Sequence, residues 1–350
     1  GLPIIQIEEK SVKHSVDEAL NQMHQYIQEK QYSDIFSTVQ ILVAMTPNRI
    51  KYMANTTAEL FNKDFAFEWQ NPNDNKVVRN WTTFADMFLS IPMAHQMSTL
   101  FTILDGTKNK QMLKVMRPYQ VYATKAVLNE LKQADFDLPI NKLGYVWHTT
   151  GSGKTLTSFK SARLATELDY IDKVFFVVDR KDLDYQTMRE YQKFQKDSVN
   201  GSKDTKELKI SIEKQDNKIV VTTIQKLNEF VKSNKGHDIY NKHCVFIYDE
   251  CHRSQFGLAQ KNIQSSFKHY YQFGFTGTPI FVENSLDGKT TSDVFGAQLH
   301  SYVITDAIRD GKVLKFLVDY TNVVAKFRKE EVYDDIINKK ELKQENLLLV

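Results

Sequence analysis

One stretch near the middle of the chain restricts most strongly what the whole chain can fold into. Apolar residues from Gly144 to Trp147 lead into His148-Thr149-Thr150-Gly151-Ser152-Gly153-Lys154-Thr155, and a helical pattern continues to Lys160. A glycine-rich turn between a strand and a helix lets backbone N–H groups close around a phosphate, and the helix N-terminus adds a favourable dipole. The stretch predicts a phosphate loop. An ordinary strand-to-helix turn is the alternative, because the strict pattern has glycine at the place of His148.

The residues of the predicted loop have separate tasks. Lys154 would reach the β- and γ-phosphates of a nucleoside triphosphate, and Thr155 would hold Mg²⁺. Backbone N–H groups around the phosphates would come from Thr150, Gly151, Ser152 and Gly153. The predicted cofactors are therefore ATP and Mg²⁺.

A motif upstream is a candidate contact for the base of the nucleotide. Arg117-Pro118-Tyr119-Gln120 opens a predicted helix that runs to about Lys132, with proline near its first turn. The Gln120 amide can both donate to and accept from an adenine edge. A plain helix start explains the same residues equally well.

A second stretch, residues 244–252, supplies the carboxylates that phosphoryl transfer needs. Its apolar residues predict a buried strand, which ends in Asp249 and Glu250. We expect Asp249 to help position Mg²⁺ and Glu250 to orient the attacking water. Two solvated acids at a strand end would explain this stretch taken alone, but a phosphate loop in the same chain makes that interpretation the less favoured one. The two cysteines, Cys244 and Cys251, are too few for a disulfide framework and are expected to be buried.

Further strands are predicted in this second half, at residues 173–178, 219–221 and 271–275. Strands that alternate with helical spacers predict βαβ units and a parallel sheet, in which ligands bind beyond the carboxyl ends of the strands. Thr276, Gly277 and Thr278 follow the last of these strands and could couple the nucleotide to DNA or to a second lobe. Their alternative role is to cap the strand before Pro279. The polar run 198–217 is predicted to be a surface insertion.

The first residues of the chain predict a different chemistry. Residues 2–7 read as a strand, and Glu8 and Lys10 lie on one face of it, because side chains alternate along a strand. A carboxylate beside an ammonium suits metal-dependent phosphodiester hydrolysis, in which Glu8 would bind the metal and Lys10 would position the water or stabilise negative charge. From these residues alone, a surface ion pair is the favoured alternative. A capping box at Ser15 then predicts a helix on which Gln22 and Tyr26 are neighbours, either contacting DNA or covering the helix flank.

The remainder of the first hundred residues is expected to be α+β. Predicted strands cover residues 38–45, 51–56 and 65–69, predicted helices cover 84–89 and 93–104, and a loop covers 70–79. We place the junction to the second half near residues 105–107. At the other end, residues 316–318 are a strand candidate, and residues 327–350 are charged and helix-like.

Composition restricts the class of protein. With 41% hydrophobic and 25% charged residues among 350, the chain is of ordinary globular composition, and its net charge of 46 − 43 = +3 permits nucleic-acid binding without arguing for it. No apolar run reaches the length of a transmembrane helix and no signal peptide is visible, so we expect no membrane contact and a reducing cytoplasm. The chain opens in a predicted strand and without methionine, which leads us to expect further residues upstream.

Six stretches occur in an order that resembles the first RecA-like lobe of superfamily 2 helicases and translocases. They are residues 117–120, 148–155, 178–180, 221–223, 249–252 and 276–279. More narrowly, the chain resembles the R (restriction and motor) subunit of type I restriction-modification enzymes, through residues 145–155, 178–183, 249–255 and 318–320. In that family His148 is a normal substitution.

The resemblance implies a fold of the α/β class with two parts. An N-terminal α+β restriction-endonuclease-like domain, incomplete at its start, would occupy residues 1–105, and a RecA-like parallel-sheet phosphate-loop domain would occupy residues 106–320. Residues 321–350 would begin the connection to a second lobe. Motifs of that lobe, including its arginine finger, are not found before Val350, so the chain alone is expected to bind nucleotide weakly and hydrolyse it poorly.

The resemblance also implies roles for single residues. Glu8 would be the acid and Lys10 the lysine of a PD-(D/E)xK nuclease, and Gln22 and Tyr26 fit the Q-x3-Y element of that family. The metal-binding aspartate of the family precedes this element and lies outside the chain, and Glu9 stands where an apolar residue is usual. Three motor residues are expected to contact DNA, namely Arg180, Thr222 and Thr223.

The function implied is that of an ATP-dependent double-stranded DNA translocase and endonuclease subunit, which would work with methyltransferase and specificity subunits and cut unmodified DNA after translocation. One alternative is a standalone DNA helicase or translocase of repair or remodelling, whose N-terminal domain binds DNA without cutting it. A Lys10→Ala protein that keeps every activity would favour this alternative. Another is a non-catalytic binding or assembly module, which an inert Lys154→Ala change would support.

Overall fold

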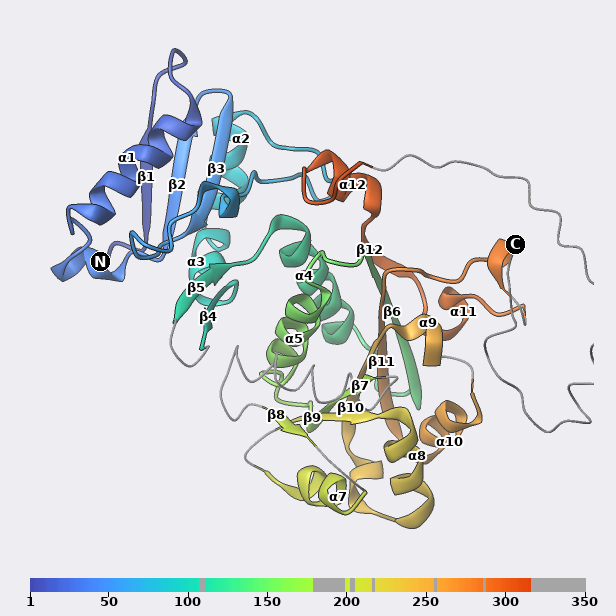
Figure 1. Cartoon of the computed structure of the whole chain (residues 1–350). Coiled ribbons are helices and arrows are strands. Elements are labelled where there is room, and N and C mark those ends of the chain that lie inside the picture. The colour runs from blue at the N-terminus through green and yellow to red at the C-terminus, as the bar shows by residue number, and fades with distance from the viewer. Residues whose placement is uncertain are drawn as a thin grey trace, which may run out of the picture.

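The computed structural model describes residues 1–106, 111–178, 199–201, 205–215, 218–254, 257–285 and 288–315, and of residues 199–201, 253 and 254 it describes the backbone alone. A small N-terminal sheet with its helices lies beside a larger region built on a central sheet (Figure 1). The α/β class predicted from the sequence is confirmed.

The small sheet has the strand order β1-β2-β3. Its strands are β1 (Ile5–Glu9), β2 (Ile41–Thr46) and β3 (Arg49–Ala54), with β1 parallel and β3 antiparallel to β2. Helix α1 (Val16–Gln28) packs on one face through its apolar side, and the predicted capping box at Ser15 starts it. The Ser15 hydroxyl accepts from the Glu18 N–H at 3.3 Å, and the Glu18 carboxylate accepts from the Ser15 N–H at 3.0 Å.

The other face of this sheet carries an aromatic core. Tyr52 packs against Phe88 with ring centroids 4.9 Å apart, and Trp69 meets the same ring edge-on at 5.0 Å. Val121 and Leu164 of the larger region join this core, so the two regions share one apolar interior. Side chains of α2 (Trp81–Phe84), η3 (Ala85–Leu89), α3 (Met93–Thr99), β4 (Thr102–Asp105) and β5 (Met112–Val115) contribute to this core. The other short elements of the region are η1 (Asp34–Thr38) and η2 (Lys63–Phe65).

Several predicted boundaries in this region are wrong. The helix predicted over 93–104 ends at Thr99, and its last residues form β4, which pairs antiparallel with β5. The reason is visible in the burial pattern, because Ile103 is buried and Leu104 is 48% exposed, which is strand alternation. Residues 65–69 make a single bridge, Tyr52 to Phe67, instead of a strand, and β3 lies two residues earlier than predicted. The junction predicted near residues 105–107 begins at the last residue of β4, and residue 107 lies outside the described residues, so this boundary stays a prediction.

The central sheet has seven strands in the order β12-β6-β11-β10-β7-β9-β8, and all neighbours are parallel. The parallel sheet predicted from the alternation of strands and helices is therefore confirmed. The strands are β6 (Ile140–His148), β7 (Lys173–Val178), β8 (Val199–Gly201), β9 (Ile219–Thr223), β10 (His243–Asp249), β11 (His269–Thr276) and β12 (Gln298–Tyr302). β6 and β10 both border β11, so their carboxyl ends lie close together.

Helices cover both faces of this sheet. α4 (Pro118–Lys132) and α5 (Lys154–Ala165) pack on one face, whereas α7 (Thr205–Glu213), α8 (Ile224–Ser233) and α10 (Leu258–Ser266) pack on the other. The remaining short elements are η4 (Asp238–Asn241), α9 (Cys251–Ser254), η5 (Val282–Asn284), α11 (Thr291–Phe295) and α12 (Ile304–Arg309). None of the helices in the described part of the chain is both long and apolar enough to cross a bilayer.

The polar run 198–217 is not the solvated insertion that its composition predicted. Its helix α7 buries Leu208 and Ile212 against the core that α8 also covers. Two apolar residues four apart lie on one side of a helix, so a run that is mostly polar can still have a buried face. Cys244 and Cys251 are buried free thiols, as expected, and burial raises the pKa of both. The strand candidate 316–318, the motif 318–320 and the charged tail lie outside the described residues.

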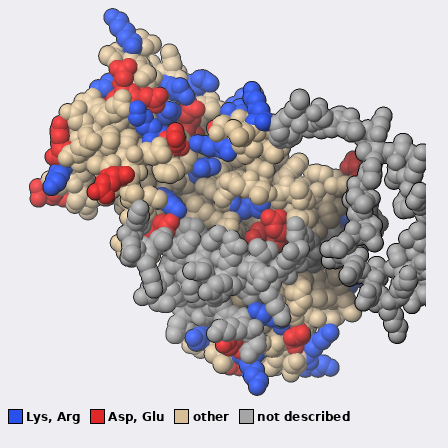
Figure 2. All heavy atoms as spheres, viewed as in Figure 1, with Lys and Arg blue, Asp and Glu red and all other residues tan. Residues whose placement is uncertain are grey.

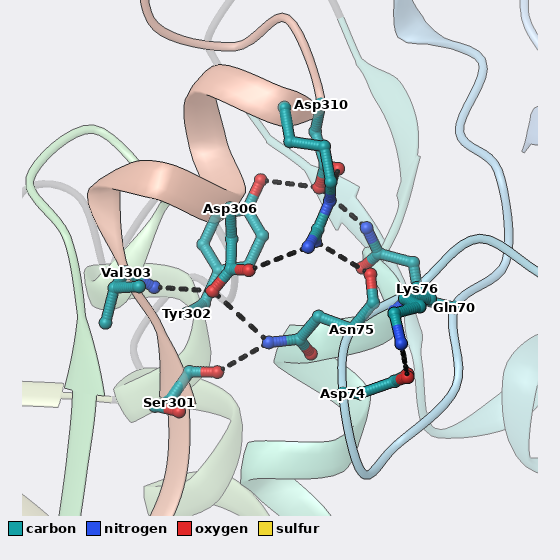
Figure 3. A network of polar contacts seen from close by, with 10 residues as sticks. Gln70, Asp74, Asn75, Lys76, Ser301, Tyr302, Val303, Asp306 and Asp310 are labelled. Atoms are coloured by element: carbon teal, nitrogen blue, oxygen red, sulfur yellow. Dashed lines mark hydrogen bonds and ion pairs between the residues drawn. The ribbon is translucent and has the colours of Figure 1, made fainter.

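A turn of the N-terminal region docks on α12. The Asn75 amide donates to the Ser301 carbonyl at 2.8 Å and to the Asp306 carboxylate at 3.4 Å, and the Arg309 guanidinium donates to the Asn75 carbonyl at 2.8 Å (Figure 3). Asn75 has a φ of 54°, in the left-handed region that asparagine tolerates better than most residues. These contacts join residues 226 positions apart in the chain, and they fix the N-terminal region against the end of the larger one.

Candidate active sites

The predicted phosphate loop lies between β6 and α5, at the carboxyl edge of the parallel sheet. Gly151 and Gly153 have φ values of 78° and 83°, in the left-handed region that favours glycine. A Cβ at Gly153 would lie 2.7 Å from the Gln120 side-chain nitrogen, so a larger residue there would displace the Gln120 side chain from the loop. Lys154 is the first residue of α5 and is only 9% exposed.

The start of α4 holds this loop in place. The Tyr119 hydroxyl donates to the Ser152 carbonyl at 2.7 Å, and the Gln120 amide nitrogen lies 3.3 Å from the carbonyls of both Ser152 and Gly153. The side-chain oxygen of Gln120 accepts a hydrogen bond from the backbone N–H of Arg117 at 3.0 Å. The Gln120 side-chain nitrogen thus donates to loop carbonyls and helps to position the loop, and its predicted contact with a base stays a prediction.

The carboxylates predicted after β10 reach the same place. The Glu250 Oε1 atom lies 3.3 Å from the Lys154 Nζ atom, and Asp249 accepts from the Glu250 N–H at 3.1 Å. Glu250 has a φ of 44°, an uncommon left-handed conformation for a residue other than glycine. The structure thus brings the predicted lysine and the predicted water-orienting acid into direct contact.

Thr276, Gly277 and Thr278 close the site from the end of β11. A Cβ on Gly277 would lie 3.4 Å from the Lys154 Nζ atom, so this segment touches the phosphate loop. The Thr276 hydroxyl accepts from the Thr278 N–H at 3.0 Å and lies 2.9 Å from His252 Nδ1. His252 in turn lies 3.6 Å from Glu250, so it contacts both the acid and Thr276. No role was assigned to His252 from the sequence, although its position two residues after Glu250 was a usable signal.

A cluster of imidazole and tyrosine rings next to the loop was also not identified from the sequence. His148 and His300 are buried with Nε2 and Nδ1 3.1 Å apart, and Tyr119 stacks on Tyr302 with centroids 3.7 Å apart. Burial lowers the pKa of His300 to about 4, and burial, with the charges of His300 and Lys154, holds the pKa of His148 well below its ordinary value. Both imidazoles are therefore neutral near pH 7. His300 and Tyr302 lie in no motif, so only their place on β12 reveals them.

The oxygen donors at this site suit Mg²⁺. Thr155 offers a hydroxyl and Asp249 a carboxylate. Mg²⁺ commonly binds one or two protein oxygens of this type and completes its coordination with nucleotide phosphates and water. Within the described ranges no group of three His, Cys, Asp or Glu side chains could hold a metal ion. The residues therefore fit a metal that is bound jointly with phosphates.

Two of the three motor residues predicted to contact DNA, Thr222 and Thr223, are not at the surface. Thr222 and Thr223 are fully buried, and the Thr223 hydroxyl accepts from the Lys226 N–H at 3.3 Å to cap α8. The expected direct DNA contact of these two side chains does not fit this structure, because both are buried and the Thr223 hydroxyl caps the helix. Arg180 lies outside the described residues.

The four residues predicted for the N-terminal site are brought together. Lys10 Nζ lies 3.0 Å from Glu8 Oε1 and hydrogen-bonds to the Gln22 side-chain oxygen. The Gln22 amide donates to the Tyr26 hydroxyl at 2.5 Å. Glu8 and Lys10 face α1 because both project from the same side of the first strand, and their side chains are 15% and 23% exposed. The arrangement is a half-buried polar chain, not a surface ion pair on a bare strand.

A metal at Glu8 would need more than these residues. The Glu8 carboxylate contacts the Lys10 ammonium, and among the residues that the structure describes it belongs to no group of three His, Cys, Asp or Glu side chains that could hold a metal ion. The Gln6 side-chain oxygen and the Tyr32 hydroxyl are buried without a hydrogen-bond partner in the described residues. Burial, and then the charge of Glu8, raise the pKa of Tyr32. The surroundings of Glu8 therefore have unused hydrogen-bonding capacity but do not by themselves form a metal site.

A wide cleft of about 940 Å³ separates the N-terminal region from α12. Its lining includes the basic residues Arg49, Lys63, Lys76, Arg79, Arg117, Arg309 and Lys312. Figure 2 shows Lys and Arg side chains gathered on the N-terminal region and beside it. Burial, and then the charge of Arg117, lower the pKa of Lys312, whereas the charges of Asp310 and Asp64 raise it. The cleft therefore holds acids as well as the more numerous basic residues.

Two family models match the chain. The model described as type I restriction enzyme R protein N terminus matches residues 1–61, and the SWI2/SNF2 ATPase model matches residues 119–346. The N-terminal candidate site lies within the first match and the nucleotide site within the second.

Relatives of known description are similar over most of the chain. The Type I restriction enzyme SsaAORF53P endonuclease subunit of Staphylococcus saprophyticus is 41% identical over 327 residues, which is 93% of this chain and 34% of that protein. The SauCOLORF180P endonuclease subunit of Staphylococcus aureus is 40% identical over 92% of this chain and 34% of that protein. The C-terminal part of the MpnIIP endonuclease subunit of Mycoplasma pneumoniae is 41% identical over 57% of this chain and 99% of that protein. The chain thus spans about a third (34%) of the length of the first two.

Proposed function

Because this chain belongs to the endonuclease subunits of type I restriction enzymes, with an ATPase region of the SWI2/SNF2 family, we propose that it is the motor and nuclease portion of such a subunit. It would use ATP to move double-stranded DNA and would cut unmodified DNA afterwards, in the cytoplasm, with methyltransferase and specificity subunits as partners. The observation that carries the proposal is the 3.3 Å contact of Lys154 with Glu250 at the phosphate loop.

The proposed hydrolysis begins with an exchange of partners. An incoming γ-phosphate competes with Glu250 for the Lys154 ammonium, because a phosphate carries more charge than a carboxylate. Once Lys154 turns to the phosphate, Glu250 is free to accept a hydrogen bond from the attacking water and to orient it. The ion pair of the nucleotide-free site would thus keep the catalytic acid occupied until a triphosphate arrives.

Thr155 and Asp249 would hold Mg²⁺, which when bound neutralises charge that develops on the transferred phosphoryl group. His252 touches both Glu250 and the Thr276 hydroxyl, so it is placed to transmit the release of Glu250 to the segment 276–278. That segment would then couple the state of the nucleotide to the DNA or to a second lobe. The basic cleft beside α12 is our candidate for contacts with DNA phosphates, because Lys and Arg side chains release counterions from DNA on binding.

The N-terminal site would supply the cutting reaction. Gln22 accepts a hydrogen bond from Lys10 and so fixes the ammonium beside Glu8, while Tyr26 accepts from the Gln22 amide. An ammonium held in this way can stabilise the charge that develops on a scissile phosphate. Glu8 would serve as one metal ligand of a complete site.

The test is cleavage of long unmethylated DNA by the natural subunit with its methyltransferase and specificity subunits, with and without ATP. We expect cleavage to require ATP and to be lost in Lys10→Ala, while ATP hydrolysis persists. Lys13→Ala, an exposed lysine on the same segment, is the matched control. DNA-stimulated ATP hydrolysis without any cleavage by the unaltered complex would contradict the nuclease part and favour a standalone translocase.

A further inference from the structure

The indole of Trp147 joins the strand that leads into the phosphate loop to the segment that follows β11. Its Nε1–H group donates to the Gly277 carbonyl at 3.1 Å. The paired ladder of β6 and β11 ends at Trp147 and Thr276, so Gly277 is the first residue beyond it. The indole therefore extends the contact between the two strands by one residue, with a side-chain donor in place of a backbone N–H.

Trp147 lies at the rim of an apolar core. Side chains alternate along β6, so Val146 faces the core that α4 and α5 cover, whereas Tyr145 and Trp147 face the core that α8 and α10 cover. The Trp147 side chain is only partly buried there, and its ring meets the Phe281 ring at a centroid distance of 5.4 Å. A phenylalanine would fill much of the same space, but it has no N–H to offer the carbonyl. The indole thus contributes a hydrogen bond that packing alone does not require.

The residue that Trp147 holds lies against the phosphate loop. A Cβ on Gly277 would stand 3.4 Å from the Lys154 Nζ atom and 3.4 Å from the His148 carbonyl oxygen. Lys154 also contacts Glu250, and in the proposed reaction its ammonium turns from that acid to a phosphate. The place of Gly277 therefore limits the space in which the ammonium moves.

The chain is fixed again shortly after Gly277. The Ile280 N–H donates to the Thr291 hydroxyl at 2.8 Å, and the Thr291 N–H donates to the Ile280 carbonyl at 2.9 Å. The segment is thus held by β11 at Thr276 and by Thr291 at Ile280. Between these two anchors, Trp147 connects the segment to the loop strand through one hydrogen bond, which the replacement of a single side chain removes.

We propose that Trp147 is a positioning residue for ATP hydrolysis, which holds the Gly277 carbonyl so that segment 276–278 keeps its place beside Lys154. With this bond made, a movement at the loop on nucleotide binding is passed to the segment, because the indole joins the two. Without it, the segment shifts more freely and the site spends less time in its productive geometry. This inference rests on the proposed function, because it takes residues 150–155 as the phosphate site.

The experiment separates affinity from turnover in the natural subunit, assembled with its methyltransferase and specificity subunits and DNA. Trp147→Phe keeps an aromatic ring against Phe281 and removes the N–H donor. We expect it to lower the kcat of DNA-stimulated ATP hydrolysis about tenfold, the effect of losing one hydrogen bond of ordinary strength in the transition state. The Kd of ATP with Mg²⁺ should stay within about twofold of the unaltered value. Trp81→Phe is the matched control, because Trp81 lies on α2 and is 48% exposed.

Intrinsic fluorescence provides a second measurement. Trp147 is one of three tryptophans in the chain, so its emission is a measurable part of the total. We expect ATP with Mg²⁺ to change the emission of the unaltered complex and of Trp81→Phe, and this change to be lost in Trp147→Phe. Equal changes in the unaltered complex and in Trp147→Phe would mean that the surroundings of the indole do not respond to the nucleotide, which overturns the proposal.

The kinetic results identify separate failures. If Trp147→Phe hydrolyses ATP within about twofold of the rate of the Trp81→Phe control, the bond to Gly277 does not position the segment and the inference is wrong. If the affinity for ATP falls as much as turnover does, the change acts on the phosphate loop as a whole, which also overturns it. Lys154→Ala tests the phosphate site itself. Hydrolysis at the unaltered rate in Lys154→Ala would refute the proposed function, whereas its loss there and full retention in Trp147→Phe would refute only the role of Trp147.

Discussion

Lys154 and Glu250 face each other across the mouth of the phosphate loop, with Nζ 3.3 Å from Oε1. The lysine side chain is 9% exposed and the glutamate side chain 31% exposed, so the pair compensates in part for the cost of withdrawing both charges from water. The contact joins the first residue after β10 to the first residue of α5. Because of this contact, a ligand phosphate must compete with the Glu250 carboxylate for the Lys154 ammonium.

Lys154→Ala should lower ATP hydrolysis about 100-fold or more, because the ammonium that would bind the β- and γ-phosphates is lost. Turnover is measured by phosphate release in the presence of DNA. Lys132→Ala serves as the control, since Lys132 is an exposed lysine in the last turn of α4. Hydrolysis at the unaltered rate in Lys154→Ala would show that the loop is not a phosphate site.

Glu250→Gln should separate binding from chemistry. The amide no longer competes for Lys154, so we expect ATP to bind as tightly as before or more tightly, whereas hydrolysis falls about 100-fold because no carboxylate remains to orient the water. Binding is measured by equilibrium titration and turnover by phosphate release. An unchanged rate, or a loss of affinity equal to that of Lys154→Ala, would contradict the role proposed for Glu250.

Asn75→Ala should lower the free energy of unfolding by about 2 kcal/mol, because the Ser301 carbonyl and the Asp306 carboxylate lose a donor and because alanine is strained at a φ of 54°. Asn75→Gly should cost about 1 kcal/mol less, since glycine accepts this backbone conformation. Urea denaturation measures both. Asn73→Ala, an exposed residue of the same turn, is expected to change the stability by less than about 0.5 kcal/mol. Equal effects of the alanine and glycine variants would exclude backbone strain as a contribution.

The stability of the fold should depend on pH through the buried histidines. The pKa of His300 falls from 6.5 to about 4 on burial, so the unfolded chain binds its proton more readily than the folded one. Stability is therefore lost as the pH falls from 6.5 towards 4, with a contribution from this group of up to about 1.4 kcal/mol per pH unit. His148 acts in the same direction, because its pKa is lowered as well.

His300→Gln should make that acid-side loss of stability shallower, because glutamine does not titrate. Thermal unfolding recorded between pH 7 and 4 is the measurement, with His14→Gln as the control at an exposed position. An unchanged slope in His300→Gln would mean that His300 takes up its proton equally well in the folded and unfolded states.

Local features of both sites were predictable from the sequence because they depend on residue type and short spacing. The glycine residues at 151 and 153 and the capping box at Ser15 occur where they were predicted, since φ preferences and helix caps involve a few consecutive residues. Glu8 and Lys10 share a face for the same reason, because side chains alternate along a strand. Prediction failed where one local pattern is compatible with two kinds of structure. Residues 102–104 were predicted to be helical, and their apolar pattern suits a helix or a strand equally well; only their pairing with β5 makes them a strand.

The sequence by itself determined that this chain has a glycine-rich phosphate loop, an acid pair after an apolar strand and a carboxylate-lysine pair at its start. Only the tertiary structure decided which of them meet. Glu250 reaches Lys154 because β11 alone lies between β6 and β10. Phe65 lines one cavity with the loop because the N-terminal core continues into α4 and α5. The order of parallel strands and the docking of one region on another are set by packing over the whole fold. They join residues far apart in the chain, which no local periodicity encodes.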